Sequence, residues 1–317
     1  MSYTIGRFPA GAVIQGLIYL ILPGGGGPTI GSKLIAPETP MTYATVMVSL
    51  ALDQPNEARL QVAGELAERF EASIIGVAAA QFAPPLYFSD GAAAQGLIDE
   101  GEASVKRRLG ELEAQFRAAI RNRGGHVEWR SAMDFPARFT FAQARCADIV
   151  VAGGQSPAFS DAFALASPKD LVMQAGRPIL VVPDGVNWLD LRSVLVVWKD
   201  TPEARRALAD ALPLLRKARD VTVLAIPEGE DDRTAAVAGA TDVTAWLARH
   251  GVTAIARVSE GARNETVAGQ LEKIAGDVGA SLIVAGAYGH SRFRELILGG
   301  VTQYLVTQSA RCVLLSH

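Results

Sequence analysis

Cysteine and histidine are scarce in this sequence. The two cysteines, Cys146 and Cys312, are too few for a disulfide framework and show no metal-ligand spacing, so we expect buried, reduced thiols. The histidines are scattered and form no ligand pair; they are His126, His250, His290 and His317. The sequence therefore argues against a disulfide-stapled fold and against a zinc site.

Long apolar runs and an excess of one charge are also missing. The net charge is -3, which gives no bulk attraction to nucleic acid or to an anionic membrane. No run reaches the ~18 apolar residues of a membrane span. The nearest one, Ala10–Leu22, is interrupted by Gln15 and ends at PGGGGP. We therefore expect a cytoplasmic protein without nucleic-acid or membrane partners.

Residues 1–40 carry little hydrophobic periodicity. The first pattern typical of a folded domain is MTYATVMVSLAL, which begins at Met41. We interpret residues 1–40 as an N-terminal extension that is disordered or that reflects a mis-annotated start. A targeting segment is the alternative, although only Arg7 precedes the apolar stretch and no small-x-small cleavage site follows it closely.

Apolar content is ample, and it is organised as an internal repeat. With 317 residues and 49% hydrophobic content, the chain can build roughly two domains. The segments TVMVSLALDQPNEARLQVAGELAERFEASIIGVAAA and SVLVVWKDTPEARRALADALPLLRKARDVTVLAI each contain a β-branched strand, a polar turn, an amphipathic helix and a second strand. Apolar strands that alternate with one-faced helices predict an α/β fold with a parallel sheet covered on both faces.

The remaining parts of the two segments also correspond. We predict HVEWRSA and VTAIARV as third strands, DIVVAGG and SLIVAGA as fourth strands, and VMQAGRPILVVP and VTQSARCVLLSH as matching ends. The predicted helix of the second segment has an apolar stripe with a period of 3.6 residues, formed by Ala204, Ala207, Leu208, Ala211, Leu212 and Leu215. We therefore predict tandem domains at residues 41–185 and 189–317, joined near DGVNWLD.

The segment LIVAGAYGHSRFRELILGGVTQYLV gathers glycines and cations around a predicted strand end. Gly286 and Gly289 follow the strand, where the lack of a Cβ atom lets backbone N–H groups approach an anion. Gly299 and Gly300 precede a predicted helix, whose free N–H groups suit a phosphate. The cations between these pairs are His290, Arg292 and Arg294. The pattern favours a phosphate site at the carboxyl edge of the sheet, with turn glycines and a solvated basic face as the alternative.

The spacing Gly286-x2-Gly289-x9-Gly299 resembles the nucleotide-binding signature of the universal stress protein family, G-x2-G-x9-G-[S/T]. The flanking AYGHSRFRELILGGVTQYL matches it almost throughout, and the resemblance extends over residues 41–317. It implies a tandem universal stress protein of two five-stranded parallel-sheet units with strand order 3-2-1-4-5, the adenine nucleotide alpha-hydrolase-like fold.

The resemblance also implies a ligand. In this family the loop holds the phosphates of ATP, and an acidic residue after the first strand contacts the adenosine end. We therefore expect ATP or AMP in the second domain only. The residues expected to bind it are Gly286, Gly289, His290, Arg292, Gly299, Gly300, Val301, Thr302 and Asp200.

The second domain departs from the family pattern after its first strand and at the end of the signature. Gly300 stands where the signature has a hydroxyl, and Thr302 lies inside the predicted helix. Where family members commonly read Asp-Gly-Ser, this chain has Lys199, Asp200 and Thr201. Asp200 is therefore either a ligand contact or part of a helix start, KDTPEA, in which Thr201 is the N-cap and proline follows at N1.

The first domain departs further. Gly153 is kept, but Pro157, Phe159 and Asp161 align with the three cations of the second domain's loop. The segment SPKD has the form of a capping box with Ser167 as the N-cap, so we expect this helix to satisfy its own N–H groups. We predict that the first domain has lost nucleotide binding.

An insertion precedes the third strand of the first domain, PPLYFSDGAAAQGLIDEGEASVKRRLGELEAQFRAAIRNRGG. We predict a helix over Glu102–Ile120 and a mobile loop over Pro84–Gly96. Its aromatic and apolar side chains either pack over the sheet or form a patch that binds a partner; they are Phe82, Leu86, Tyr87 and Phe88.

Together these patterns favour a non-enzymatic stress-response protein that binds ATP or another adenine nucleotide. The alternative is a nucleotide-free scaffold or partner-binding module of the same fold. No second carboxylate, nucleophile–base pair or metal-binding set accompanies the glycine loop, so we expect no enzyme. Slow ATP hydrolysis would need Mg²⁺ held by the nucleotide's own phosphates. The resemblance further implies that PILVVP and CVLLSH pair within the chain, which makes an intramolecular pseudo-dimer.

Overall fold

The computed structural model describes residues 42–52, 54–83, 91–123, 125–154, 161–227, 229–259, 266–287 and 300–317. Residues 43–317 cluster as one compact unit, separate from residues 1–42. The N-terminal extension predicted for residues 1–40 lies outside the described residues. None of the helices within those ranges is both long enough and apolar enough to span a membrane.

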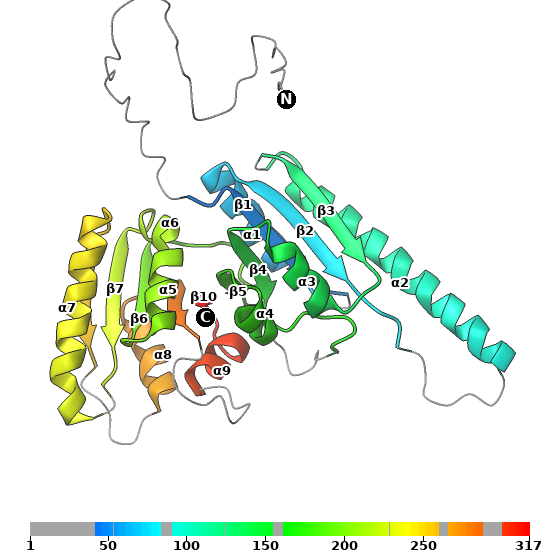
Figure 1. Cartoon of the computed structure of the whole chain (residues 1–317). Helices are drawn as coiled ribbons and strands as arrows, with labels where there is room; N and C mark the ends of the chain where they lie inside the picture. Colours follow the sequence, from blue (N-terminus) through cyan, green and yellow to red (C-terminus); the bar gives the residue numbers. More distant parts are fainter. Residues whose placement is uncertain are drawn as a thin grey trace, which may run out of the picture. The chain divides into compact units, whose positions relative to one another are not determined.

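In the described ranges ten strands form one sheet in the order β3-β2-β1-β4-β5-β10-β9-β6-β7-β8 (Figure 1). Five belong to a first repeat, namely β1 (Thr45–Leu50), β2 (Ser73–Ala79), β3 (Val127–Ala132), β4 (Ile149–Gly153) and β5 (Ile179–Val182). Five belong to a second repeat, namely β6 (Ser193–Trp198), β7 (Asp220–Ala225), β8 (Ala254–Val258), β9 (Leu282–Gly286) and β10 (Cys312–Ser316).

Helices connect the strands of each repeat. In the first repeat they are α1 (Glu57–Phe70), α2 (Gly91–Ile120), α3 (Pro136–Ala144) and α4 (Pro168–Gln174). In the second repeat they are α5 (Pro202–Asp210), α6 (Leu212–Leu215), the 3-10 turn η1 (Glu230–Asp232), α7 (Arg233–Arg249), α8 (Val267–Asp277) and α9 (Gly300–Thr307).

Both repeats have the same topology. Within each one the strands are parallel and lie in the order third, second, first, fourth, fifth. The predicted α/β fold with strand order 3-2-1-4-5 is therefore confirmed. The second and third strands lie on one side of the first strand, and the fourth and fifth lie on its other side. The strand order therefore reverses between the first and the fourth strand, which is the switch point of each repeat.

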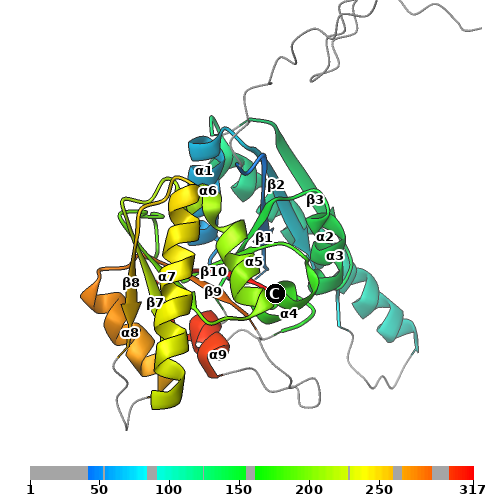
Figure 2. The same ribbon diagram turned by 60° about the vertical axis from the view of Figure 1, so that its left-hand side comes forward.

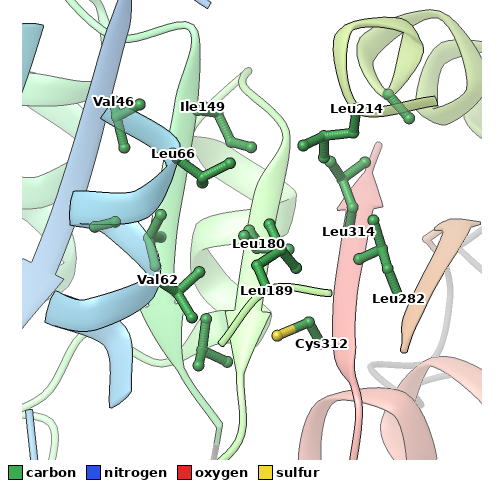
Figure 3. Close-up of a cluster of buried hydrophobic side chains, with 14 of the residues drawn as sticks. Val46, Val62, Leu66, Ile149, Leu180, Leu189, Leu214, Leu282, Cys312 and Leu314 are labelled. Carbon is green, nitrogen blue, oxygen red and sulfur yellow. The ribbon is translucent and has the colours of Figure 1, made fainter. Parts of the chain in front are cut away.

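The two repeats meet through their last strands. Strand β10 pairs with β5 antiparallel, and Val313 lies opposite Val181. Figure 3 shows Leu180 of β5 next to Cys312 and Leu314 of β10, inside one buried cluster. Since all other pairs are parallel, the strands of the two repeats run in opposite directions. Their carboxyl ends therefore lie at opposite edges of the sheet.

Hydrophobic side chains cover both faces of the sheet because successive strand residues alternate. Val46 and Val48 of β1 face one cluster, with the buried sides of α1, α2, α5, α6 and α7. Met47 faces the other cluster, with α3, α4, α8 and α9. Figure 2 shows α7 lying along β7 and β8, which closes the first layer at the outer strands. The stripe predicted for the helix after β6 is confirmed, since all six of its residues are buried.

The structure corrects the prediction for the inserted helix. Helix α2 already begins at Gly91, so residues 91–96, predicted as loop, are helical. Glycine disfavours helix at positions 91 and 96, but three alanines and a glutamine lie between them, and alanine has the highest helix propensity. Phe82 packs against the core, as one of the two alternatives predicted, whereas residues 86–88 lie outside the described residues.

Two further local predictions were wrong. Cys312 is buried as expected, but Cys146 is exposed because it lies in the turn between α3 and β4. Ser167 does precede α4, with Pro168 at the first helical position, but its side chain makes no capping hydrogen bond. Residue type therefore placed the start of α4 correctly and failed to predict how its N–H groups are satisfied.

Candidate functional site

The switch point of the second repeat lies between β6 and β9. These strands are parallel neighbours, with Val197 opposite Ala285, so their carboxyl ends lie side by side. The chain then continues as Lys199 and Asp200 after β6, and as Ala287 after β9. Open α/β sheets bind ligands at this type of edge, because loops and helix starts gather there.

Gly286 is the last residue of β9, and helix α5 lies directly on it. A Cβ atom at this position would lie 2.6 Å from the carbonyl carbon of Glu203 and 2.8 Å from the Cα atom of Ala204. Real Cβ atoms essentially never come so close to backbone. Gly286 therefore has a packing reason to be glycine, which holds with or without a ligand.

Helix α9 leads from this edge back to the start of β10. Its first residue, Gly300, is exposed, and nothing lies within 4 Å of a Cβ atom placed on it. Val301 is half-buried and Thr302 is buried in the first turn. The backbone N–H groups in the first turn of an α-helix have no intrahelical acceptor, so they can bind an anion, and the helix dipole favours negative charge there.

Contacts farther along hold α9 in place. The hydroxyl of Tyr304 donates to Glu272 of α8, with an O–O distance of 2.8 Å. Arg311, just before β10, pairs with the same carboxylate and donates to the carbonyl oxygen of Ala280. Burial and the hydrogen bond to Glu272 both raise the pKa of Tyr304, so the phenol remains a donor at neutral pH. Helix α9 is therefore fixed to its neighbours.

Asp200 lies at the same edge, but it is exposed and forms an ion pair with Arg205. The helix-start interpretation of KDTPEA is confirmed: α5 begins at Pro202, and the hydroxyl of Thr201 accepts a hydrogen bond from the N–H of Ala204 at 3.3 Å. The Asp200 carboxylate already has an ionic partner in Arg205. A contact between Asp200 and a ligand remains a prediction.

The other expected site residues divide into two groups. Gly286, Gly300, Val301 and Thr302 lie on β9 and α9 as the spacing predicted. The remaining members lie outside the described residues, and these are Gly289, His290, Arg292 and Gly299. The described part of the site is thus a strand end, a helix start and the turn after β6.

One acidic group at this edge was not among the expected contacts. The Oε2 atom of Glu203, in the first turn of α5, is buried and has no hydrogen-bond partner among the described residues. Sequence reasoning placed this residue in a helix start, where acids are common. The burial of this oxygen depends on tertiary packing around α5, and a local sequence pattern does not predict such packing. Within the described ranges, no group of three or more His, Cys, Asp or Glu side chains could hold a metal ion.

The equivalent edge of the first repeat is filled by the side chain of Arg59. A Cβ atom on Gly153, the last residue of β4, would run into the guanidinium of Arg59, with its Nε atom 2.9 Å away. The guanidinium donates to the carbonyl oxygens of Ser49 and Pro55, both at 3.3 Å, and to the side-chain oxygen of Gln54 at 3.1 Å. The switch point between β1 and β4 is therefore occupied by the chain itself.

Burial changes the chemistry of this arginine. Arg59 is 3% exposed, and its desolvation lowers the pKa of the guanidinium to about 10, although Asp184 and Glu57 act in the opposite direction. It remains a cation at neutral pH. Helix α1 starts later after β1 than α5 does after β6, so Arg59 fills the space that the backbone of α5 fills in the second repeat.

Two parallel-sheet repeats with switch points of this kind define a tandem, doubly wound α/β protein. The family model of the universal stress protein family matches residues 191–317. This match covers the segment whose glycine spacing resembles the signature of the same family. No curated protein matches the chain.

Solved structures support the same fold for both repeats. A universal stress protein from Archaeoglobus fulgidus DSM 4304 is 17% identical, and the match covers 86% of this chain and 97% of that one with a TM-score of 0.59. A putative universal stress protein from Pseudomonas aeruginosa UCBPP-PA14 is 14% identical, with coverages of 86% and 93% and a TM-score of 0.54. A universal stress protein in complex with cAMP is 21% identical, and the match covers 40% of this chain and 97% of that one with a TM-score of 0.30. The first two matches span both repeats, which confirms the tandem α/β architecture.

Proposed function

We propose that this chain is a non-enzymatic stress-response protein that binds ATP or another adenine nucleotide in its second repeat. The observation that carries the proposal is the start of α9 at Gly300, where a Cβ atom would have open space, within the segment that the universal stress protein family model matches. Phosphate oxygens would accept hydrogen bonds from the backbone N–H groups of this turn. The predicted contacts of Gly289, His290, Arg292 and Gly299 belong to the same proposal.

The fit of a nucleotide to this edge is supported by two features of the described residues. Space is open at Gly300, where a Cβ atom would meet nothing within 4 Å. Among the residues that the structure describes, no donor pairs with the buried Oε2 atom of Glu203. Mg²⁺ would be held by the phosphates of the nucleotide, because the described residues offer no cluster of metal ligands.

Calorimetry on the purified full chain tests this function. The wild-type protein should bind ATP at or below millimolar concentration, and nucleotide released from it should contain adenine. Gly300→Val, which places a branched side chain over the first turn of α9, should weaken binding on the order of tenfold or more, as should Gly289→Val. Ser167→Val, the matched change before α4 of the first repeat, should leave binding unchanged.

The competing function is a scaffold that binds no nucleotide. It is favoured by the first repeat, whose switch point is filled by Arg59. If the wild-type chain binds no adenine nucleotide at millimolar concentration, the scaffold is the better account of both repeats. If the wild type binds and Gly300→Val binds equally well, the site lies elsewhere.

We also propose that the pairing of β5 with β10 makes the chain an intramolecular pseudo-dimer in the cytoplasm. Support comes from the antiparallel register, with Leu180 opposite Leu314 and Ile179 opposite Leu315. A contact across the junction adds to this support, because Tyr43 donates to the carbonyl oxygen of Asp210 at 2.7 Å.

An assay for phosphate release with Mg²⁺ and ATP tests the absence of catalysis, for which we expect no more than slow turnover.

A further inference from the structure

We infer that Gly154 of the first repeat is a positioning residue for the proposed nucleotide site of the second repeat, on which it acts through helix α9. The inference rests on the proposed function, because it concerns how α9 presents its first turn to a phosphate. The observation behind it is a contact between the repeats. A Cβ atom on Gly154 would lie 3.8 Å from the carbonyl oxygen of Val306, in the last turn of α9.

Helix α9 connects the carboxyl edges of the two repeats. It begins at Gly300, at the proposed phosphate position, and its 8 residues span about 12 Å. The chain then enters β10, whose first residues lie beside the carboxyl end of β5, with Val313 opposite Val181. Gly154 lies at the same place, because its N–H donates to the carbonyl oxygen of Val182 at 2.9 Å. One end of α9 therefore belongs to the second repeat's edge, and the other end meets the edge of the first repeat.

The contact with α9 is separate from the filling of the first switch point. Gly153 lies against Arg59 of α1, and the buried side of α1 belongs to the cluster on one face of the sheet. Gly154 lies against Val306, which belongs to the cluster on the other face. The two glycines thus meet different neighbours on opposite faces, and Arg59 takes no part in the contact with α9.

The space at Gly154 is large enough for a methyl group. Its Cβ atom would lie 3.6 Å from the Cα atom of Pro183 and 3.8 Å from the carbonyl oxygens of Val182 and Val306, which are ordinary contact distances. These three nearest atoms all belong to the backbone, so a neighbouring side chain cannot make room by changing its rotamer. A branched side chain at this position would therefore press on the backbone of β5 or of α9.

Pressure on the last turn of α9 would reach its first turn. The helix is held at its side, because Tyr304 donates to Glu272 of α8 and Arg311 pairs with the same carboxylate. Its backbone hydrogen bonds are internal, so a short helix moves as one body. A push at the last turn would slide α9 along its axis or tilt it about Tyr304. Either motion displaces the N–H groups at Gly300 from the phosphate.

The experiment compares two ligands on variants of the full chain. Calorimetry measures the binding of ATP and of adenosine to the wild type, Gly154→Ala and Gly154→Val. Adenosine lacks the phosphates that α9 would bind, so it reports on the rest of the site. Gly110→Val is the matched control, because Gly110 lies on the exposed side of α2 and nothing is within 4 Å of its Cβ position.

Gly154→Val should bind ATP about fivefold to tenfold more weakly than the wild type, the effect of one or two misaligned hydrogen bonds to phosphate. Its affinity for adenosine should not change. Gly154→Ala should bind both ligands as the wild type does, since a methyl group fits. Gly300→Val already blocks the first turn of α9, so adding Gly154→Val to it should cause no further loss.

Four results would overturn the inference while leaving the proposed function intact. They are ATP binding by Gly154→Val that equals the wild type, an equal loss for ATP and adenosine, the same loss in Gly110→Val, and full additivity of Gly154→Val with Gly300→Val. Failure of the wild type to bind ATP would instead reject the proposed function itself. Gly154→Leu, which is not branched at its Cβ atom, carries the test if Gly154→Val does not fold.

Discussion

Glycines at equivalent strand ends have different neighbours in the two repeats. Gly286 lies against the backbone of α5, and Gly153 lies against the guanidinium of Arg59. In the first case a methyl group would meet backbone that cannot move without shifting a helix. In the second it would meet the end of a long side chain, which is held by three hydrogen bonds. The same residue type at the same place therefore carries different constraints.

We expect Gly286→Ala to lower the free energy of unfolding by about 1–3 kcal/mol, because the added methyl group overpacks the contact with α5. Chemical denaturation of the full chain measures this. Gly300→Ala is the control, since open space at that position makes a steric cost absent. Equal stability of Gly286→Ala and the wild type would show that α5 can retreat from β9.

The two cysteines should differ sharply in reactivity. A hydrogen bond from Arg130 lowers the pKa of the exposed Cys146 thiol, whereas burial raises the pKa of Cys312 to about 12. A lower pKa gives more thiolate at neutral pH, and the thiolate is the nucleophile. Maleimide at pH 7 should therefore label Cys146 rapidly and Cys312 only on unfolding.

Arg130→Ala should slow the labelling of Cys146, most clearly below the ordinary thiol pKa, and Cys146→Ser should abolish the fast reaction. Mass spectrometry of the labelled peptides assigns each rate. Rapid labelling of Cys312 in the folded chain would contradict its burial between the repeats.

At the scale of elements, the order of strands and helices could be predicted from hydrophobic periodicity, because each repeat alternates apolar strands with one-faced helices. The start of α5 was predictable too, since Thr201 and the following proline form a local signal. The filling of the first switch point by Arg59 was not. It depends on how far α1 stands from β4, which is set by the turn at residues 51–56 and by packing across the sheet. The spacing of residues in the sequence reports neither the conformation of that turn nor the packing across the sheet.

A substitution at the start of helix α9 should change the affinity for ATP. Gly300→Ser adds the hydroxyl that the family signature has at this position, and the site has room for it. A hydroxyl at the start of a helix can donate to a phosphate oxygen, so we expect ATP affinity to rise several-fold, by about 1 kcal/mol. Calorimetry on the full chain measures the change, with Gly300→Ala as the variant that adds a side chain without a donor. A weaker affinity in Gly300→Ser than in Gly300→Ala would contradict the proposed phosphate position.

For the whole molecule, the pairing of β5 with β10 determines which strand edges remain open. Both last strands are covered by each other, and the outer strands of the sheet are β3 and β8. The linker between the repeats is held as well. Glu65 of α1 accepts from the backbone N–H of Leu189 at 2.9 Å, and Arg69 donates to the carbonyl oxygen of the same residue at 3.2 Å. These contacts fix the linker to α1 of the first repeat.

The full chain should therefore be a monomer at micromolar concentration in sedimentation experiments. A fragment of residues 189–317 would expose β10 and should self-associate through that edge. Its mass by light scattering, compared with that of the full chain, tests the expectation. A fragment that is folded and monomeric would show that β10 is stable without a partner strand.

The antiparallel junction has a consequence for how the two edges can change. In a dimer of identical subunits every substitution is present twice, so both binding edges must change together. Here different residues form the carboxyl edge of each repeat, and these two edges lie at opposite ends of the sheet's strands. Arg59 can close the first edge without altering the second, and a substitution at Gly300 can tune the second without altering the first. The covalent link thus lets the two copies of the same fold change independently of each other.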